Sequence, residues 1–207
     1  MNAEPALFSQ EEIDLIKDQK FFHAKARIMA KVRDQLVATH AALKREVARA
    51  ELLTPPDFDL ARYQLVKGEH LGDFPYQYLD FPKHFMGDEK FTFRTLFWWG
   101  HHFVFAVILE GARLLQYKQN IINRYREVAE QGIHLSLAPS LWEWRADTGY
   151  TLPLTADRKP EVSAVLTGRA SFKLARFLPC DDPAVGSGGL PTMACETFRA
   201  ILPVIRP

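Results

Sequence analysis

Residues 91–110 read FTFRTLFWWGHHFVFAVILE and decide the fold of this 207-residue chain. From Phe91 to Trp98 the residues alternate in character, as they do along a β-strand whose two faces have different surroundings. Gly100 can adopt the positive φ of a tight reversal, so the chain is predicted to turn there. Residues 102–109 return as a second strand, and their almost continuous apolarity predicts burial on both faces. The stretch therefore predicts an antiparallel hairpin at the centre of a sheet.

The N-terminal part, residues 1–54, is predicted to be helical. Ser9 and Glu12 have the spacing of a capping box, which indicates that a first helix begins there. A second, long helix is predicted from residue 22 to 53, ending before Pro55 and Pro56. Its apolar stripe includes Phe22, Met29, Leu36 and Leu43 at seven-residue intervals. Such a short run favours packing on the chain's own sheet or on its first helix, and the alternative is self-association with a second copy.

The sheet is predicted within residues 61–178, with one inserted helix. An edge strand is expected at residues 76–79, because prolines flank it and an edge tolerates proline best. The remaining elements predicted from periodicity and turn residues are a helix at 114–131, strands at 133–137, 142–145 and 171–178, a short helix at 160–166, a flexible GSGG segment at 186–189 and a terminal helix at 190–202 that Pro203 ends.

The expected fold class is α+β, in one domain spanning residues 1–207. Strands mixed with irregularly spaced helices favour a mainly antiparallel sheet of five or six strands over a doubly wound parallel fold. We expect the long N-terminal helices to pack on one face of this sheet. A chain of this length has room for a sizeable core.

Composition excludes several broad classes of function. The 26 Lys and Arg residues nearly balance the 25 Asp and Glu residues, which removes any global attraction to nucleic acid or to an anionic membrane. The longest apolar run, residues 103–109, is much too short to span a bilayer. Cys180 and Cys195 lack CxxC spacing, and the amino terminus does not resemble a signal peptide, so a cytoplasmic location is expected.

The segments GEHLGDFPYQYLDFPKHF, residues 68–85, and FRTLFWWGHHF, residues 93–103, carry one resemblance. Together they resemble a family of bacterial proteins in which an LDYP-type segment precedes an FRTxFWWG-type hairpin. Phe81 stands where tyrosine is more usual in the first motif. The resemblance implies a cytosolic bacterial origin and transfers neither an activity nor a catalytic residue.

The candidate ligand-binding residues cluster at the predicted hairpin: Arg94, Trp98, Trp99, His101 and His102. An exposed tryptophan beside Arg94 could stack on a planar ligand. Adjacent strand residues point to opposite faces, however, so neither the two tryptophans nor the two histidines are expected to act as a pair. The same geometry argues against a metal bound by His101 and His102, and no zinc-type motif supports one.

No motif in the chain identifies a reaction or a cofactor. The leading hypothesis is therefore a non-enzymatic binding or accessory protein that uses an aromatic-lined pocket or a protein-interaction surface. One alternative is a small-molecule enzyme in which His101 or His102 works with a carboxylate as general acid and base. A weaker alternative is nucleic-acid binding through a basic face of the 114–131 helix, formed by Arg113, Lys118, Arg124 and Arg126.

Overall fold

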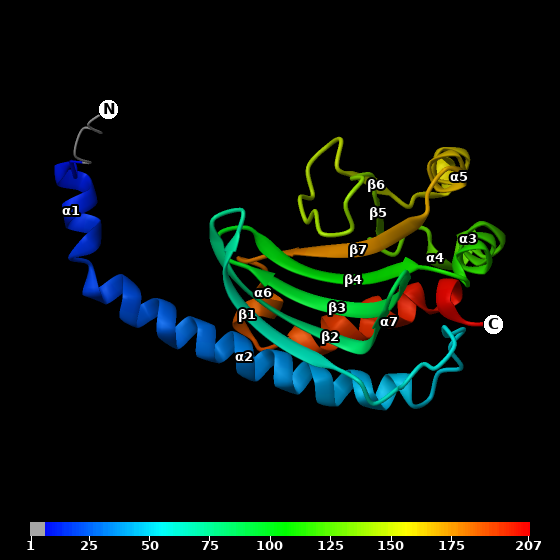
Figure 1. Cartoon of the computed structure of the whole chain (residues 1–207), viewed down its shortest axis with the longest axis horizontal. Helices are drawn as coiled ribbons and strands as arrows, with labels where there is room; N and C mark the ends of the chain where they lie inside the picture. The colour runs from blue at the N-terminus through cyan, green and yellow to red at the C-terminus, as the bar shows by residue number, and fades with distance from the viewer. Residues whose placement is uncertain (1–6) are drawn as a thin grey trace.

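The structure is a computed structural model that describes residues 7–207, and its fold is α+β (Figure 1). One antiparallel sheet has the strand order β1-β2-β3-β4-β7-β5-β6. Its seven strands are β1 (Gln64–Leu71), β2 (Phe74–Met86), β3 (Glu89–Trp98), β4 (His102–Glu110), β5 (His134–Ser136), β6 (Thr151–Pro153) and β7 (Ser171–Pro179). The expectation of five or six strands was wrong, because β1 and the three-residue β6 have mixed sequences that lack a clear alternation of apolar and polar residues.

The central hairpin is formed by β3 and β4. Its pairing runs from Lys90 opposite Glu110 to Trp98 opposite His102 without a break in register. Gly100 adopts a φ of 74° in the turn, a conformation that glycine reaches without strain. At the edge of β4 that does not face β3, this strand pairs with β7 along its whole length. Every residue from Phe103 to Leu109 is buried, because alternate side chains of β4 enter the apolar clusters on the two faces of the sheet.

Strand β2 is not the edge strand that the sequence suggested. It pairs with β1 on one side and with β3 on the other, so β1 is the edge at this end of the sheet. Pro82 lies where the β2–β3 register shifts between Asp80 and Lys83. A bulge of this kind accommodates a residue that has no N–H to donate, which lets proline occupy an inner strand.

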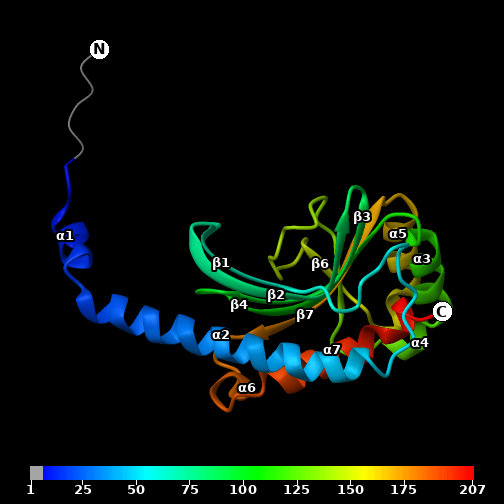
Figure 2. The same ribbon diagram turned by 60° about the horizontal axis from the view of Figure 1, so that its bottom comes forward.

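The helices cover one face of the sheet and one of its ends. They are α1 (Gln10–Ile16), α2 (Gln19–Val47), α3 (Leu114–Asn123), α4 (Tyr125–Val128), α5 (Lys159–Thr167), α6 (Pro183–Gly186) and α7 (Leu190–Ile205), with a 3-10 turn at Ala156–Arg158. Figures 1 and 2 show α2 and α7 side by side beneath the sheet. Met29, Leu36 and Leu43 of α2 belong to the main core, whereas α1 contributes no buried residue.

Several helix boundaries differ from the sequence predictions, and three of the differences are informative. Helix α2 ends at Val47 rather than at residue 53, and the 114–131 helix is divided into α3 and α4 at Arg124. Helix α7 continues past Pro203 to Ile205. Pro203 lies in the last turn, where the absence of one N–H removes only one intrahelical hydrogen bond.

The two faces of the sheet have different covers. The helix face carries the main core, to which Phe93, Phe97 and Phe105 contribute. The loop face carries a smaller apolar cluster that includes Leu96, Trp98 and Trp144. Its cover comes from the segment between β5 and β6, which passes over β7 in Figure 1. The side chain at each strand position therefore meets one of two separate environments.

The segment 142–145 is part of this covering loop and not the strand that the sequence predicted. The carboxylate of Glu143 accepts hydrogen bonds from the backbone N–H groups of Trp144 and Arg145, at 2.9 and 3.0 Å. This local bonding closes a turn and withdraws both N–H groups from strand pairing. Trp144 still packs against the sheet, so the alternation of tryptophans reflected burial and not a strand.

Candidate functional site

The hairpin tip sends its two tryptophans to opposite faces. Trp98 lies on the loop face, where its indole N–H donates to the carbonyl of Leu71 at 2.7 Å. Trp99 packs on the helix face, with its ring centroid 5.9 Å from that of Phe97. The two indoles therefore do not form one ligand platform, and each must be considered with the face on which it lies.

The two histidines lie beside Trp98. The exposed His101 ring stacks on Trp98 at a centroid distance of 3.7 Å. The half-buried His102 places Nε2 2.9 Å from the carbonyl oxygen of Trp144, and burial lowers its pKa. Within residues 7–207 neither ring is hydrogen-bonded to a carboxylate.

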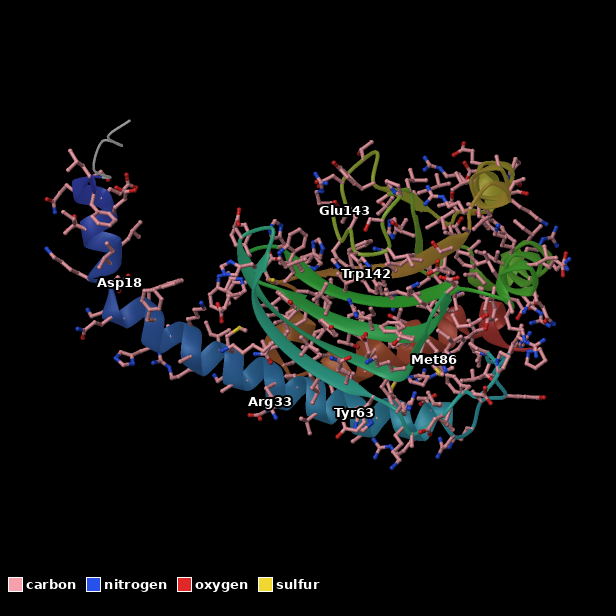
Figure 3. The ribbon with its side chains drawn as sticks, in the orientation of Figure 1. Asp18, Arg33, Tyr63, Met86, Trp142 and Glu143 are labelled. Carbon is pink, nitrogen blue, oxygen red and sulfur yellow. The ribbon has the colours of Figure 1, made fainter. Side chains whose placement is uncertain are left out.

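Arg94 is buried on the loop face and is already paired. Its guanidinium donates two hydrogen bonds to the carboxylate of Asp80, at 2.7 and 2.8 Å. The guanidinium carbon also lies 3.8 Å from the ring centroid of Tyr78 and 5.0 Å from that of Trp142. Figure 3 shows Trp142 on the covering loop above the sheet. Arg94 thus ties β2, β3 and this loop together, and with Tyr78, Trp142 and Trp144 it lines a hollow of about 350 Å³ on the loop face.

Lys173 of β7 is a second buried cation, which the sequence analysis missed. Its ammonium donates to the backbone carbonyls of Leu141, at 3.1 Å, and Glu143. It also lies 3.8 Å from the ring centroid of Trp144. Burial lowers the pKa of Lys173 to about 7. A lysine in the apolar context of Phe172 and Leu174 was the only sequence signal that could have revealed it.

A mainly apolar hollow lies on the helix face, at the tip of the hairpin. Its volume is about 510 Å³, and it lies between α2, the β3–β4 turn and the chain around α6. Its apolar wall is formed by Ile28, Val32, Phe97, Trp99, Phe103 and Leu190. We call this hollow the tip cavity. Of the five residues singled out in the sequence, only Trp99 lines it.

A few polar groups interrupt the apolar wall of the tip cavity. Oε1 of Gln35 is buried and has no hydrogen-bond partner in the described part of the chain. Lys31 and Asp34 also border the cavity, and so does Cys180. Partial burial raises the pKa of the Cys180 thiol, and the nearby carboxylate of Asp181 adds to this shift. The site thus combines aromatic rings with one unused hydrogen-bond acceptor.

Most cations of the proposed basic face serve the fold. Arg113 donates to the carbonyl of Thr54, and Lys118 donates to the carbonyl of Arg169. Arg124 donates to the carbonyls of Pro203, Arg206 and Pro207. These contacts hold α3 against neighbouring segments, so three of the four cations are not displayed as a free row.

No protein-family model, curated protein or solved structure matches the chain. Across residues 7–207, no group of three or more His, Cys, Asp or Glu side chains is placed to hold a metal ion. None of the helices in that range is both long enough and apolar enough to cross a membrane. We therefore infer function from the geometry of the chain itself.

Proposed function

We propose that this protein is a binding protein that takes up a small, mainly apolar molecule in the tip cavity. The observation that supports the proposal is an open hollow of about 510 Å³ walled by three aromatic rings, those of Phe97, Trp99 and Phe103. Ligand sites in proteins are commonly concave, of about 300–1,000 Å³, and lined by apolar side chains with a few polar groups. The tip cavity has this size and this composition.

The polar groups narrow the class of ligand. The unpartnered Oε1 of Gln35 leaves a buried acceptor unsatisfied, which is unfavourable until a donor reaches it. A ligand with an apolar, preferably aromatic, body and one hydroxyl or N–H group would satisfy this acceptor. Lys31 and Asp34 have opposite charges at the border of the cavity, so no strong selection for a charged ligand is expected.

Fluorescence titration with N-phenyl-1-naphthylamine tests the proposal, because this probe has an aromatic body and a single N–H donor. We expect saturable binding with a stoichiometry of one. Ile28→Trp places a larger side chain at the cavity wall and should weaken binding about tenfold, equivalent to about 1.4 kcal/mol. Val37→Trp is the matched control, because Val37 lies exposed on the same helix and does not line the cavity.

Gln35→Leu separates the two parts of the recognition. This variant should bind the N–H probe more weakly and should bind naphthalene, which has no donor, at least as tightly as the unaltered protein. Non-saturating binding, or equal effects of Ile28→Trp and Val37→Trp, would show that the tip cavity is not a ligand site.

We also propose the cytoplasm as the compartment of this protein. Cys180 and Cys195 are both free thiols, as is usual in proteins that work in reducing surroundings. Thiol labelling of the protein in intact cells would test this, and oxidation of both residues in the native protein would contradict it.

A further inference from the structure

Residues 7–27 form an arm that extends from the body of the protein. The arm consists of α1 and the first turns of α2, and none of its residues is buried. Figures 1 and 2 show α1 at a distance from the sheet and from the other helices. Figure 3 places Asp18 at the bend between α1 and α2. Helix α1 therefore lacks the cover that the fold gives to its other helices, whereas the first turns of α2 contact the body through the Lys25–Glu69 ion pair and the Phe21–Trp99 ring contact.

The arm exposes large apolar side chains in spite of this position. Leu15 is 63% exposed, Ile16 is 65% exposed and Phe22 is 55% exposed. Helix α1 has only seven residues, and within residues 7–207 it buries no side chain. Isolated helices shorter than about 12 residues are marginal in water, because most helical stability in proteins comes from packing an apolar face. The arm thus has the properties of a helix that is stabilised by a partner.

The charges of the arm indicate which partner fits. Before and at the bend, the acidic residues Glu11, Glu12, Asp14 and Asp18 outnumber the single cation Lys17. After the bend, residues 19–27 of the arm contain three cations and no acid. The cations are Lys20, Lys25 and Arg27, of which Lys25 is already paired with Glu69 at 2.6 Å. Each arm therefore has an acidic half and a basic half.

We infer that the arm pairs with the arm of a second copy of this chain, in an antiparallel arrangement with a two-fold axis close to Asp18. Two-fold symmetry sets the acidic half of each arm against the basic half of the other, so both charge contacts are favourable at once. The same arrangement brings Ile16 of one copy towards Phe22 of the other and covers the exposed apolar residues. This inference is independent of ligand binding in the tip cavity.

Multi-angle light scattering on the full chain across a concentration series tests the inference. We expect the unaltered protein to have twice the mass of one chain. Ile16→Asp combined with Phe22→Asp should weaken the dimer at least tenfold without changing the circular dichroism of the body. Val37→Asp is the control, because Val37 is exposed on α2 outside the arm and should leave the dimer intact.

Charge reversal identifies a second copy of the arm as the partner. Glu11→Arg with Asp14→Arg gives an arm with two basic halves, and Lys20→Glu with Arg27→Glu gives an arm with two acidic halves. Each double variant alone should dissociate at low salt, whereas an equimolar mixture of the two should form a heterodimer. A monomeric unaltered protein, a dimer unaffected by the arm variants, or a mixture that stays monomeric would overturn the inference.

Discussion

Lys173 shows how one buried residue gives this fold a pH-dependent stability. The side chain is 1% exposed, and burial lowers its pKa to about 7, well below the usual lysine value. A neutral amine keeps two N–H groups, which suffice for the carbonyls of Leu141 and Glu143. Between pH 7 and about 10 the unfolded chain therefore holds a proton that the folded chain has released. Stability rises with pH wherever the unfolded state binds more protons.

Urea unfolding at several pH values compares the protein with Lys173→Met. Raising the pH from 7 to 9 should increase the free energy of unfolding more for the unaltered protein than for the variant. The slope of that difference cannot exceed about 1.4 kcal/mol per pH unit for a single proton. Lys159→Met is the control, because Lys159 is exposed. Parallel pH profiles for the protein and Lys173→Met would contradict the assignment.

The Asp80–Arg94 pair makes a second residue-scale prediction. Both side chains are almost completely buried, so each is the main charge compensation of the other. Asp80→Leu leaves a buried guanidinium without its carboxylate and should cost about 3–5 kcal/mol of the free energy of unfolding. The double variant with Arg94→Met removes both charges and should recover most of this loss. Chemical denaturation of the two single variants and the double variant measures the coupling.

A coupling energy near zero in that cycle would mean that the pair contributes no more than its separate side chains.

At the residue scale, only part of the site could be predicted from the sequence. Alternation along β3 correctly separates Trp98 from Trp99. It could not reveal that Asp80 neutralises Arg94, or that Gln35 leaves an acceptor unused, because both depend on neighbours distant in the sequence.

At the scale of elements, the sequence predicted those structures that local interactions determine. The capping box at Ser9, the turn at Gly100 and the continuous apolar run of β4 are all present. Elements that depend on pairing were harder to predict. The short β6 exists because β5 offers it a partner, and the 142–145 segment turns because Glu143 bonds the backbone locally. The prolines led to the wrong prediction of an edge strand at β2, because a bulge accommodates Pro82 in an inner strand.

At the scale of the whole molecule, the tip cavity could not be inferred from the sequence. Its walls come from α2, from the central hairpin and from the chain near Leu190, which lie far apart along the sequence. The predicted site around Arg94, Trp98, Trp99, His101 and His102 identified the hairpin but mixed the two faces of the sheet. Only the packing of α2 and α7 on one face shows that Trp99 borders the tip cavity, while Arg94 lines a separate hollow on the loop face.

The long helix α2 joins the two proposed activities, and its residues should behave differently according to their place. Leu36 is 1% exposed and lies in the core shared by α2, the sheet and α7, whereas its neighbour Val37 is 50% exposed. Leu36→Ala should lower the free energy of unfolding by about 2–5 kcal/mol, because it opens a cavity in that core. Val37→Ala should change it by less than about 0.5 kcal/mol.

Urea unfolding measures both effects, and light scattering of the same samples completes the test. If the arm alone forms the dimer, Leu36→Ala should remain a dimer at concentrations where it is folded, since Leu36 packs inside its own chain. If Leu36→Ala is instead a folded monomer with an unchanged free energy of unfolding, the apolar stripe of α2 with its seven-residue spacing is the interface. If Leu36→Ala lowers the free energy of unfolding but keeps the mass of a dimer, the stripe belongs to the core. The arm, where the apolar residues are exposed, then forms the dimer contact.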